Sequence, residues 1–130
     1  MPDTMTLAKY RLETALETLN DAKALFESGG YKGGNNRAYY SIFHGMRAVL
    51  ALEKIDFKKH SGVISYFQQK YIKTGIFDVK YSAVIKSASL LRNQSDYDDF
   101  YLASREETQE QIANAEIFLT AVKNYLDSKE

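Results

Sequence analysis

The sequence predicts an all-α fold, namely an antiparallel four-helix bundle with one additional short helix. Along five segments, apolar residues recur at steps of three and four, the spacing that places side chains on one face of a helix. No segment sustains the period-two alternation that is typical of strands. The only proline is Pro2, so no helix interior is interrupted. We therefore expect five helices joined by short loops.

Length and composition predict one domain over residues 1–130, with a helical core at about 6–126. A chain of 130 residues with 45% hydrophobic residues can bury a core without covalent cross-links. The lack of cysteine excludes disulfides and thiolate metal sites, and it suits a reducing compartment. Because neither a signal peptide nor an apolar run of about 18 residues is present, we expect a cytoplasmic protein that does not contact a membrane.

The first helix is predicted from Thr6 to Ser28. Gly29 and Gly30 are expected to end it, because glycine adopts the left-handed conformation at little cost. We interpret the stretch from Gly29 to Asn36 as a connector, since it lacks the Gly-Lys-Ser/Thr ending of a phosphate loop. The apolar stripe of the helix consists of Leu12, Ala15, Leu16, Leu19, Ala22, Leu25 and Phe26.

The central helix, from Asn35 to Leu52, carries two stripes of different character. Its apolar stripe should be core and consists of Tyr39, Ile42, Phe43, Met46, Val49 and Leu50. Its polar, partly aromatic stripe consists of Arg37, Tyr40, Ser41, His44 and Arg47. A helix that simply faced solvent would not need this second stripe. It is either a seam against another helix or subunit, or a recognition surface.

Two more helices are expected in the middle of the chain. After a loop from Lys54 to His60, Ser61 should cap a short third helix, and Gly75 should end it. The fourth helix should start near Asp78 or Val79. The residues expected to face inward are Val63, Ile64, Phe67 and Tyr71 in the third helix, and Tyr81, Val84, Ile85, Ala88 and Leu91 in the fourth.

The last helix has the most specific start signal of the five. Ser104 is followed three residues later by Glu107, which is the pattern of a capping box. Before it, residues 98–103 should form a brief irregular link in which Phe100 and Tyr101 pack. The apolar positions of the last helix are Ile112, Ala115, Leu119, Val122 and Leu126, flanked by Phe118 and Tyr125.

The charges are unevenly distributed although their formal sum is zero. Eight basic residues face two acids between positions 54 and 92, whereas nine acids oppose three basic residues from Asn93 onward. The two regions could attract each other within a subunit or across a dimer. Alternatively, the basic region stays free to bind phosphates.

The densest polar cluster, at the end of the fourth helix, consists of Arg92, Asn93, Asp96 and Tyr97. Arg92 and Asp96 are four residues apart and can pair along one face, which gives a helix-terminating ion pair. Alternatively, Arg92 holds a phosphate and its neighbours orient it.

The two histidines, His44 and His60, do not indicate a metal site. Neither stands in a His-x-x-x-His or Glu-x-x-His pairing, so we expect no metal and no cofactor. His44 lies inside the central helix, where a histidine usually has an interhelical partner. Lys59 and His60 lie at a helix entrance, where they could meet a phosphate.

Several separated motifs resemble, in order and spacing, the prokaryotic HEPN domain. They are NRAYYSIFH at 36–44, KHSGVI at 59–64, KTG at 73–75 and RNQSDY at 92–97. The resemblance extends from about Thr6 to Leu126. It implies four long helices with a shorter extra one, a homodimer, and a minimal nucleotidyltransferase as partner in a toxin-antitoxin or other defence system.

Catalytic members of this superfamily are metal-independent ribonucleases in which a histidine follows an arginine after four to six residues. Arg92 matches the arginine, but Tyr97, Asp98 and Asp99 stand where the histidine is expected. A phenol has an ordinary pKa of about 10 and is a poor base at neutral pH. The resemblance therefore implies the fold and the dimer without the standard ribonuclease motif.

These observations favour a homodimeric HEPN-domain protein that binds RNA or a nucleotide. The candidate site residues are Arg92, Asp96 and Tyr97 for catalysis, and Arg37, Tyr40, His44, Arg47, Lys59, His60 and Asn93 for binding. One alternative is an active endoribonuclease in which His44 or His60 approaches Arg92. Another is a purely structural module that assembles through the face of Arg37 and His44. Tyr97 could also accept a nucleotidyl group from the partner enzyme.

The aromatic residues outside the core stripes, which could seal a dimer, are Tyr10, Tyr31, Tyr40, Phe100 and Tyr101.

Overall fold

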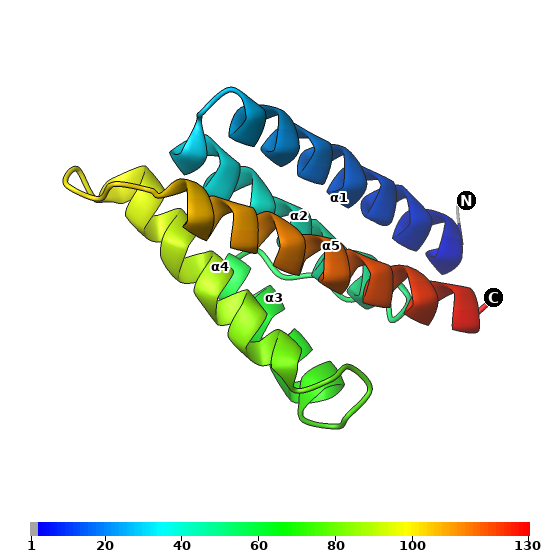
Figure 1. Ribbon diagram of the computed structural model, residues 1–130. Helices are drawn as coiled ribbons and strands as arrows, with labels where there is room; N and C mark the ends of the chain where they lie inside the picture. The colour runs from blue at the N-terminus through cyan, green and yellow to red at the C-terminus, as the bar shows by residue number, and fades with distance from the viewer. Residues whose placement is uncertain (1–2) are drawn as a thin grey trace.

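The computed structural model describes residues 3–130, and the predicted all-α fold class is confirmed. No strand is found within these residues. A π-helix, η1 (Gln68–Ile72), extends the short third helix (Figure 1). The five α-helices are α1 (Thr4–Glu27), α2 (Tyr31–Ala51), α3 (His60–Phe67), α4 (Lys80–Tyr97) and α5 (Arg105–Ser128).

The helix α2 is the centre of the fold, since it packs against α1, α3, α4 and α5. Figure 1 shows α1, α2 and α5 lying side by side, with α4 diverging from α5 along its length. The α1 and α5 helices run antiparallel, because Lys23 near the end of α1 pairs with Glu116 in the first half of α5. The α2 and α4 helices also run antiparallel, because Tyr40 contacts Arg92 and Asn36 contacts Asp96.

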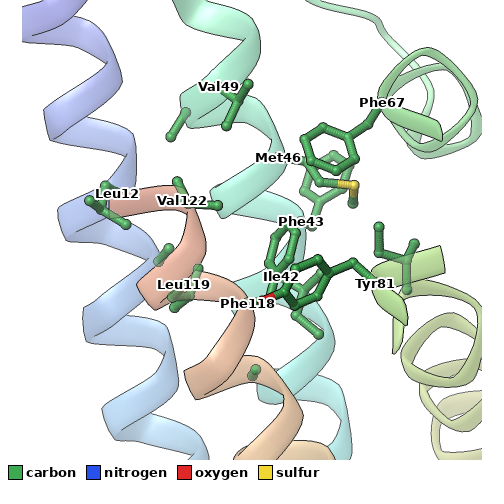
Figure 2. Close-up of a cluster of buried hydrophobic side chains, with 14 of the residues drawn as sticks. Leu12, Ile42, Phe43, Met46, Val49, Phe67, Tyr81, Phe118, Leu119 and Val122 are labelled. Carbon is green, nitrogen blue, oxygen red and sulfur yellow. The ribbon is translucent and has the colours of Figure 1, made fainter. Parts of the chain in front are cut away.

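The hydrophobic core lies where α2 meets the other helices (Figure 2). Ile42 and Met46 of α2 are fully buried, as is Phe118 of α5, whose ring packs edge-on against those of Phe67 and Tyr81. The apolar stripe predicted for the central helix is buried throughout. Burial of this stripe contributes hydrophobic free energy to the packing of α2 against its neighbouring helices.

The predicted connector from Gly29 to Asn36 is wrong, because α2 already begins at Tyr31. Only Gly29 closes α1 in the left-handed region, with φ at 83°. Gly34 lies inside the helix and serves close packing: a Cβ there would lie 2.7 Å from Cγ2 of Thr108 in α5. Gly45 plays the same part further along, since its Cβ would lie 2.6 Å from Leu119. These glycines let α2 and α5 approach each other rather than breaking the helix.

Some predicted helix starts are corrected and one is confirmed. The first helix starts at Thr4, because the side chain of Asp3 accepts a hydrogen bond from the backbone N–H of Thr6. Ser61 does not cap α3, whose first residue is His60 and which has no side-chain cap. The capping box of Ser104 and Glu107 is confirmed at the start of α5.

Two residues that were predicted to pack, Leu16 and Phe100, are exposed, whereas Tyr101 is half-buried. Leu16 is exposed on α1, because it faces the outer side of the α1–α5 contact. Phe100 does not pack, since 94% of its surface is exposed in the link before α5. Tyr101 is half-buried there and donates a hydrogen bond to Glu107. Within residues 3–130, no helix combines the length and apolar character needed to cross a bilayer.

Candidate functional site

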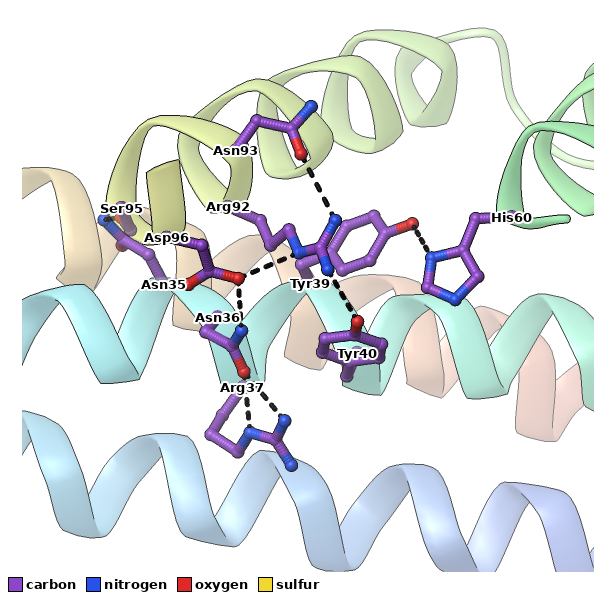
Figure 3. Close-up of polar contacts among 10 residues, drawn as sticks. All are labelled: Asn35, Asn36, Arg37, Tyr39, Tyr40, His60, Arg92, Asn93, Ser95 and Asp96. Carbon is purple, nitrogen blue, oxygen red and sulfur yellow. Dashed lines mark hydrogen bonds and ion pairs between the residues drawn. The ribbon is translucent and has the colours of Figure 1, made fainter. Parts of the chain in front are cut away.

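Arg92 lies near the end of α4 and reaches across to α2 (Figure 3). Its Nη2 donates a hydrogen bond to the hydroxyl of Tyr40 at 2.8 Å, and its Nη1 donates to Oδ1 of Asn93 at 3.2 Å. Its Nε lies 3.1 Å from a carboxylate oxygen of Asp96, but the N–H is not aligned with that oxygen, so this contact is an ion pair. Arg92 is therefore not held by Asp96 alone.

Aromatic rings surround the guanidinium of Arg92. Its Cζ lies 5.5 Å from the ring centroid of Tyr39, 5.3 Å from that of Tyr40 and 5.5 Å from that of Tyr97. The side chain keeps 19% of its surface exposed. A guanidinium has five N–H groups, and only two of those of Arg92 donate hydrogen bonds to residues 3–130. Of the other three, Nε–H is buried beside Asp96, so the second N–H of each terminal nitrogen is what remains for an oxyanion such as a phosphate.

A second arginine, Arg37, lies against the ring of Tyr40 and is linked to Asp96 by a chain of hydrogen bonds. Asn36 donates to Asp96 at 2.9 Å, and its side-chain oxygen accepts bonds from Nε and Nη2 of Arg37 at 2.9 and 2.7 Å. The guanidinium of Arg37 lies 5.1 Å from the ring centroid of Tyr40. Two cations thus lie on one ring, and Asn36 and Asp96 fix their separation.

His60, the first residue of α3, joins this cluster. Its Nδ1 lies 3.0 Å from the hydroxyl of Tyr39, and its ring centroid lies 4.1 Å from that of Phe43 and 5.6 Å from that of Tyr40. Burial, followed by the charges of Arg92 and Arg47, lowers the pKa of His60. Burial raises the pKa of Tyr39 to about 12, so this phenol keeps its proton. A neutral imidazole therefore lies beside a neutral phenol and a cation.

His44 occupies the other side of Tyr40, one turn further along α2. Its ring centroid lies 6.4 Å from that of Tyr40 and 6.0 Å from that of Phe43. Burial, followed by the charges of Arg47 and Arg37, lowers its pKa, and Arg92 is not among the causes. Of the two histidines, His60 is therefore the one electrostatically coupled to Arg92.

Two predicted binding residues lie outside these contacts. Arg47 pairs with Asp56, with Nη2 at 2.6 Å from one oxygen and Nε at 3.2 Å from the other, so it fastens α2 to the loop before α3. Lys59 is exposed at the N-cap position of α3, directly before His60, and its side chain makes no hydrogen bond or ion pair within residues 3–130. Tyr97 is 72% exposed at the end of α4.

The structure adds two residues that the sequence did not indicate as functional. Tyr39 was assigned to the core and is indeed buried, but its hydroxyl contacts His60. Asn36 was assigned to a connector, yet it links Arg37 to Asp96. A buried tyrosine usually finds a partner for its hydroxyl, and this rule could have indicated Tyr39.

We refer to Arg37, Tyr39, Tyr40, His60, Arg92, Asn93 and Asp96, together with Asn36, as the Arg92 cluster. It lies on the surface between α2, α3 and α4 rather than in a deep pocket. A hollow of about 740 Å³ lies elsewhere, between the start of α1 and the end of α2. Among residues 3–130, no set of His, Asp and Glu side chains converges as metal ligands would. An open cluster of cations and aromatic rings suits an extended anionic ligand better than an enclosed small molecule.

A family model described as the HEPN domain matches residues 8–125. The chain belongs to the HEPN family. The resemblance drawn from the four sequence motifs is thus confirmed.

Relatives of this HEPN protein align with it along most of their length. The protein named "Putative toxin MJ0142" of Methanocaldococcus jannaschii is 36% identical over 118 residues, which cover 91% of this chain and 80% of the relative. Another from that organism, "Putative toxin MJ0605", is also 36% identical, over 88% of this chain and 85% of the relative. The "UPF0332 protein" of Thermotoga maritima is 29% identical over 93% of this chain and 92% of its own.

The coupling of His60 to Arg92 makes a prediction about titration. Replacing Arg92 by Gln removes the nearby positive charge, so the pKa of His60 should rise toward its ordinary value, while that of His44 should stay unchanged. In the unsubstituted HEPN domain, the lowered pKa means that the folded state disfavours protonated His60. The stability that depends on neutral His60 is therefore fully present above a pH of about 6.5 and is lost as the pH falls below that value. Imidazole chemical shifts recorded by NMR against pH measure both values. Equal shifts of both histidines, or no shift of His60, would contradict the coupling.

Proposed function

We propose that this HEPN domain is a homodimeric, RNA- or nucleotide-binding component of a toxin-antitoxin or other defence system, with a nucleotidyltransferase as partner. The observation that carries the proposal is the Arg92 guanidinium, which Tyr40, Asn93 and Asp96 hold at the surface with unused N–H donors. The names of the two relatives from Methanocaldococcus jannaschii support the toxin part.

The Arg92 cluster suits a nucleic-acid ligand because it combines two kinds of contact. Arg37 and Arg92 offer donors for phosphate oxygens, and the exposed Tyr97 offers a ring on which a base can stack. Lys59 extends the positive surface toward the loop before α3. Asp98 and Asp99, which follow Tyr97, carry the opposite charge and should limit the contact on that side.

Binding of short single-stranded RNA tests the proposal directly. Arg92→Ala should weaken binding by about tenfold, because it removes charge-assisted hydrogen bonds, and the salt slope should fall by about one. Tyr40→Phe keeps the ring but frees the guanidinium, so it should cause a smaller loss. Lys123→Ala, an exposed cation on α5, is the control and should bind as the unsubstituted protein does. A fluorescence titration at two salt concentrations measures these effects. Absence of binding at low salt, or binding that does not change in Arg92→Ala, would remove this function.

A second candidate function is metal-independent RNA cleavage, and the contact between Tyr39 and His60 favours it. If Nδ1–H of His60 donates to the oxygen of Tyr39, Nε2 carries the lone pair that can take the proton of a ribose 2′-hydroxyl. The 2′-oxygen then forms a bond to the adjacent phosphorus, and the bond from phosphorus to the 5′-oxygen breaks. The leaving 5′-oxygen takes a proton from solvent, and Arg92 stabilises the negative charge on the phosphate.

The two histidines provide a matched pair for testing cleavage. His60→Ala should lower the rate by about a hundredfold or more, the usual contribution of a general base, whereas His44→Ala should leave the rate close to that of the unsubstituted protein. The measurement is the appearance of 2′,3′-cyclic phosphate ends on a labelled RNA. RNA that stays intact with the unsubstituted protein, or cleavage that neither substitution reduces, would exclude this candidate.

The proposed homodimer is supported by an apolar stripe on the outer side of α4. Val79, Ala83 and Leu90 follow one another at steps of four and seven, and all are exposed. Phe100 and Leu102 continue the stripe into the link, where they are 94% and 87% exposed. A patch of this kind is usually covered by another chain. Because α4 also carries Arg92, a second copy packed on this stripe would bring the two Arg92 clusters toward each other.

Disrupting the stripe on α4 should separate the subunits. Leu90→Glu places a charge in the proposed contact and should convert the dimer into monomers, whereas Leu16→Glu on α1 should not. Sedimentation velocity at micromolar concentration measures the change. If the unsubstituted protein is a monomer at that concentration, both the dimer and a purely structural assembly module are excluded.

The proposal of a nucleotidyltransferase partner rests on the family resemblance and on the position of Tyr97. Its hydroxyl is accessible, and no described side chain accepts or donates a hydrogen bond there. In a nucleotidyl transfer, the phenol oxygen would bond to the α-phosphorus of a nucleoside triphosphate, pyrophosphate would leave, and the phenol proton would pass to solvent. The modified residue would place a phosphate beside Arg92 and block the cluster, as an antitoxin would.

A further inference from the structure

A groove runs along the outer side of the contact between α1 and α5. Its wider part has a volume of about 460 Å³ and is lined by Phe26 and Glu27 of α1 and by Ala113 and Ile117 of α5, among others. A narrower part of about 210 Å³ continues along Leu16 and Thr120. Lys23 and Glu116 line both parts, and their ion pair lies between them; we name the two neighbouring hollows together the α1/α5 groove. It shares no residue with the Arg92 cluster.

The α1/α5 groove has an apolar floor and exposed apolar walls. Ile112 and Leu19 form parts of the floor and are 8% and 4% exposed. On the walls, Ile117 remains 52% exposed and Leu16 remains 44% exposed. Two antiparallel helices with a furrow of this kind can receive the apolar face of a third helix.

The acids beside the groove outnumber the bases that are free to neutralise them. Glu13 lies on the same stripe of α1 as Leu16 and Glu27, and Glu106 and Glu110 lie on the same stripe of α5 as Ala113 and Ile117. Within residues 3–130, no ion pair is formed by any of the four glutamates Glu13, Glu27, Glu106 and Glu110.

Most bases on the same two helices are already paired with acids. Lys23 pairs with Glu116 at 3.0 Å, and Lys123 pairs with Asp127 at 2.8 Å. Lys9 pairs with Glu130. The guanidinium of Arg105 lies 4.9 Å from the ring centroid of Phe26. Arg105 forms no ion pair within residues 3–130, so four unpaired glutamates face one unpaired guanidinium, and the rim keeps an excess of negative charge next to an apolar surface.

We propose that the α1/α5 groove docks a basic amphipathic helix of a partner protein. Aliphatic side chains of that helix would occupy the hollow beside Ile117, and flanking Lys or Arg side chains would meet Glu27 and Glu110. This surface is additional to the proposed function, because it lies on other helices than Arg92 and uses charge of the opposite sign.

The charge of the rim argues against other occupants. A second copy that contacted the groove through its own α1/α5 groove would place carboxylates against carboxylates. RNA would bring phosphates to the same carboxylates and should be repelled. A cationic helix gains from both the apolar surface and the charge, so it is the occupant that the groove fits best.

The probe for this surface is a synthetic helix of leucine and lysine of about 15 residues, roughly four turns. Its matched partner replaces every lysine by glutamate. Isothermal titration with the full chain should show binding of the basic peptide only. Ile117→Ser should weaken this binding about tenfold, while Ile76→Ser, which alters an isoleucine of nearly equal exposure before α4, should leave it unchanged.

A pair of charge variants completes the test. Glu27→Gln with Glu110→Gln should weaken binding and reduce its salt dependence, whereas Glu17→Gln with Asp21→Asn, acids of α1 that do not line the groove, should do neither. Absence of binding, equal binding of the acidic peptide, or equal effects of Ile117→Ser and Ile76→Ser would overturn the proposal.

Discussion

The close approach of α2 to α5 is the constraint on which the rest of the structure depends. At Gly34 and Gly45 there is no space for a side chain, so the backbone of α2 lies directly against Thr108 and Leu119 of α5. A helix placed so deeply has neighbours on several sides, and α2 indeed packs against every other α-helix. Its polar residues therefore cannot all face water and must find partners on neighbouring helices.

The Arg92 cluster is the outcome of that requirement. Tyr39 is buried by the packing of α2, and its hydroxyl is satisfied by His60 of α3. Tyr40, one residue further round the helix, receives a hydrogen bond from Arg92 of α4. The same contacts that satisfy buried polar groups bring a cation, an imidazole and two phenols together. Stability and the proposed chemistry therefore rest on the same side chains, and a substitution such as Tyr39→Phe would alter both.

The molecule presents different surfaces to different partners. The Arg92 cluster offers positive charge and aromatic rings, the outer stripe of α4 offers apolar side chains, and the α1/α5 groove combines an apolar floor with a negative rim. The local charges that sum to zero over the whole chain are thus separated in space. An anionic ligand, a second subunit and a basic partner helix could bind without competing for one site.

The sequence by itself determined the fold class, the burial of the apolar stripe of α2, the capping box of α5 and the family. These follow from local spacing and from short motifs, because helical periodicity and capping act over a few residues. It also placed Arg92, Asn93 and Asp96 on adjoining turns of α4. The tertiary structure alone decided that the charge of Arg92 acts on His60 rather than on His44, that Asn36 links Arg37 to Asp96, and that Arg47 instead binds Asp56. Those outcomes depend on how closely helices pack at two glycines and on which turn faces which neighbour, and such distances between segments far apart in the chain are not encoded in local periodicity.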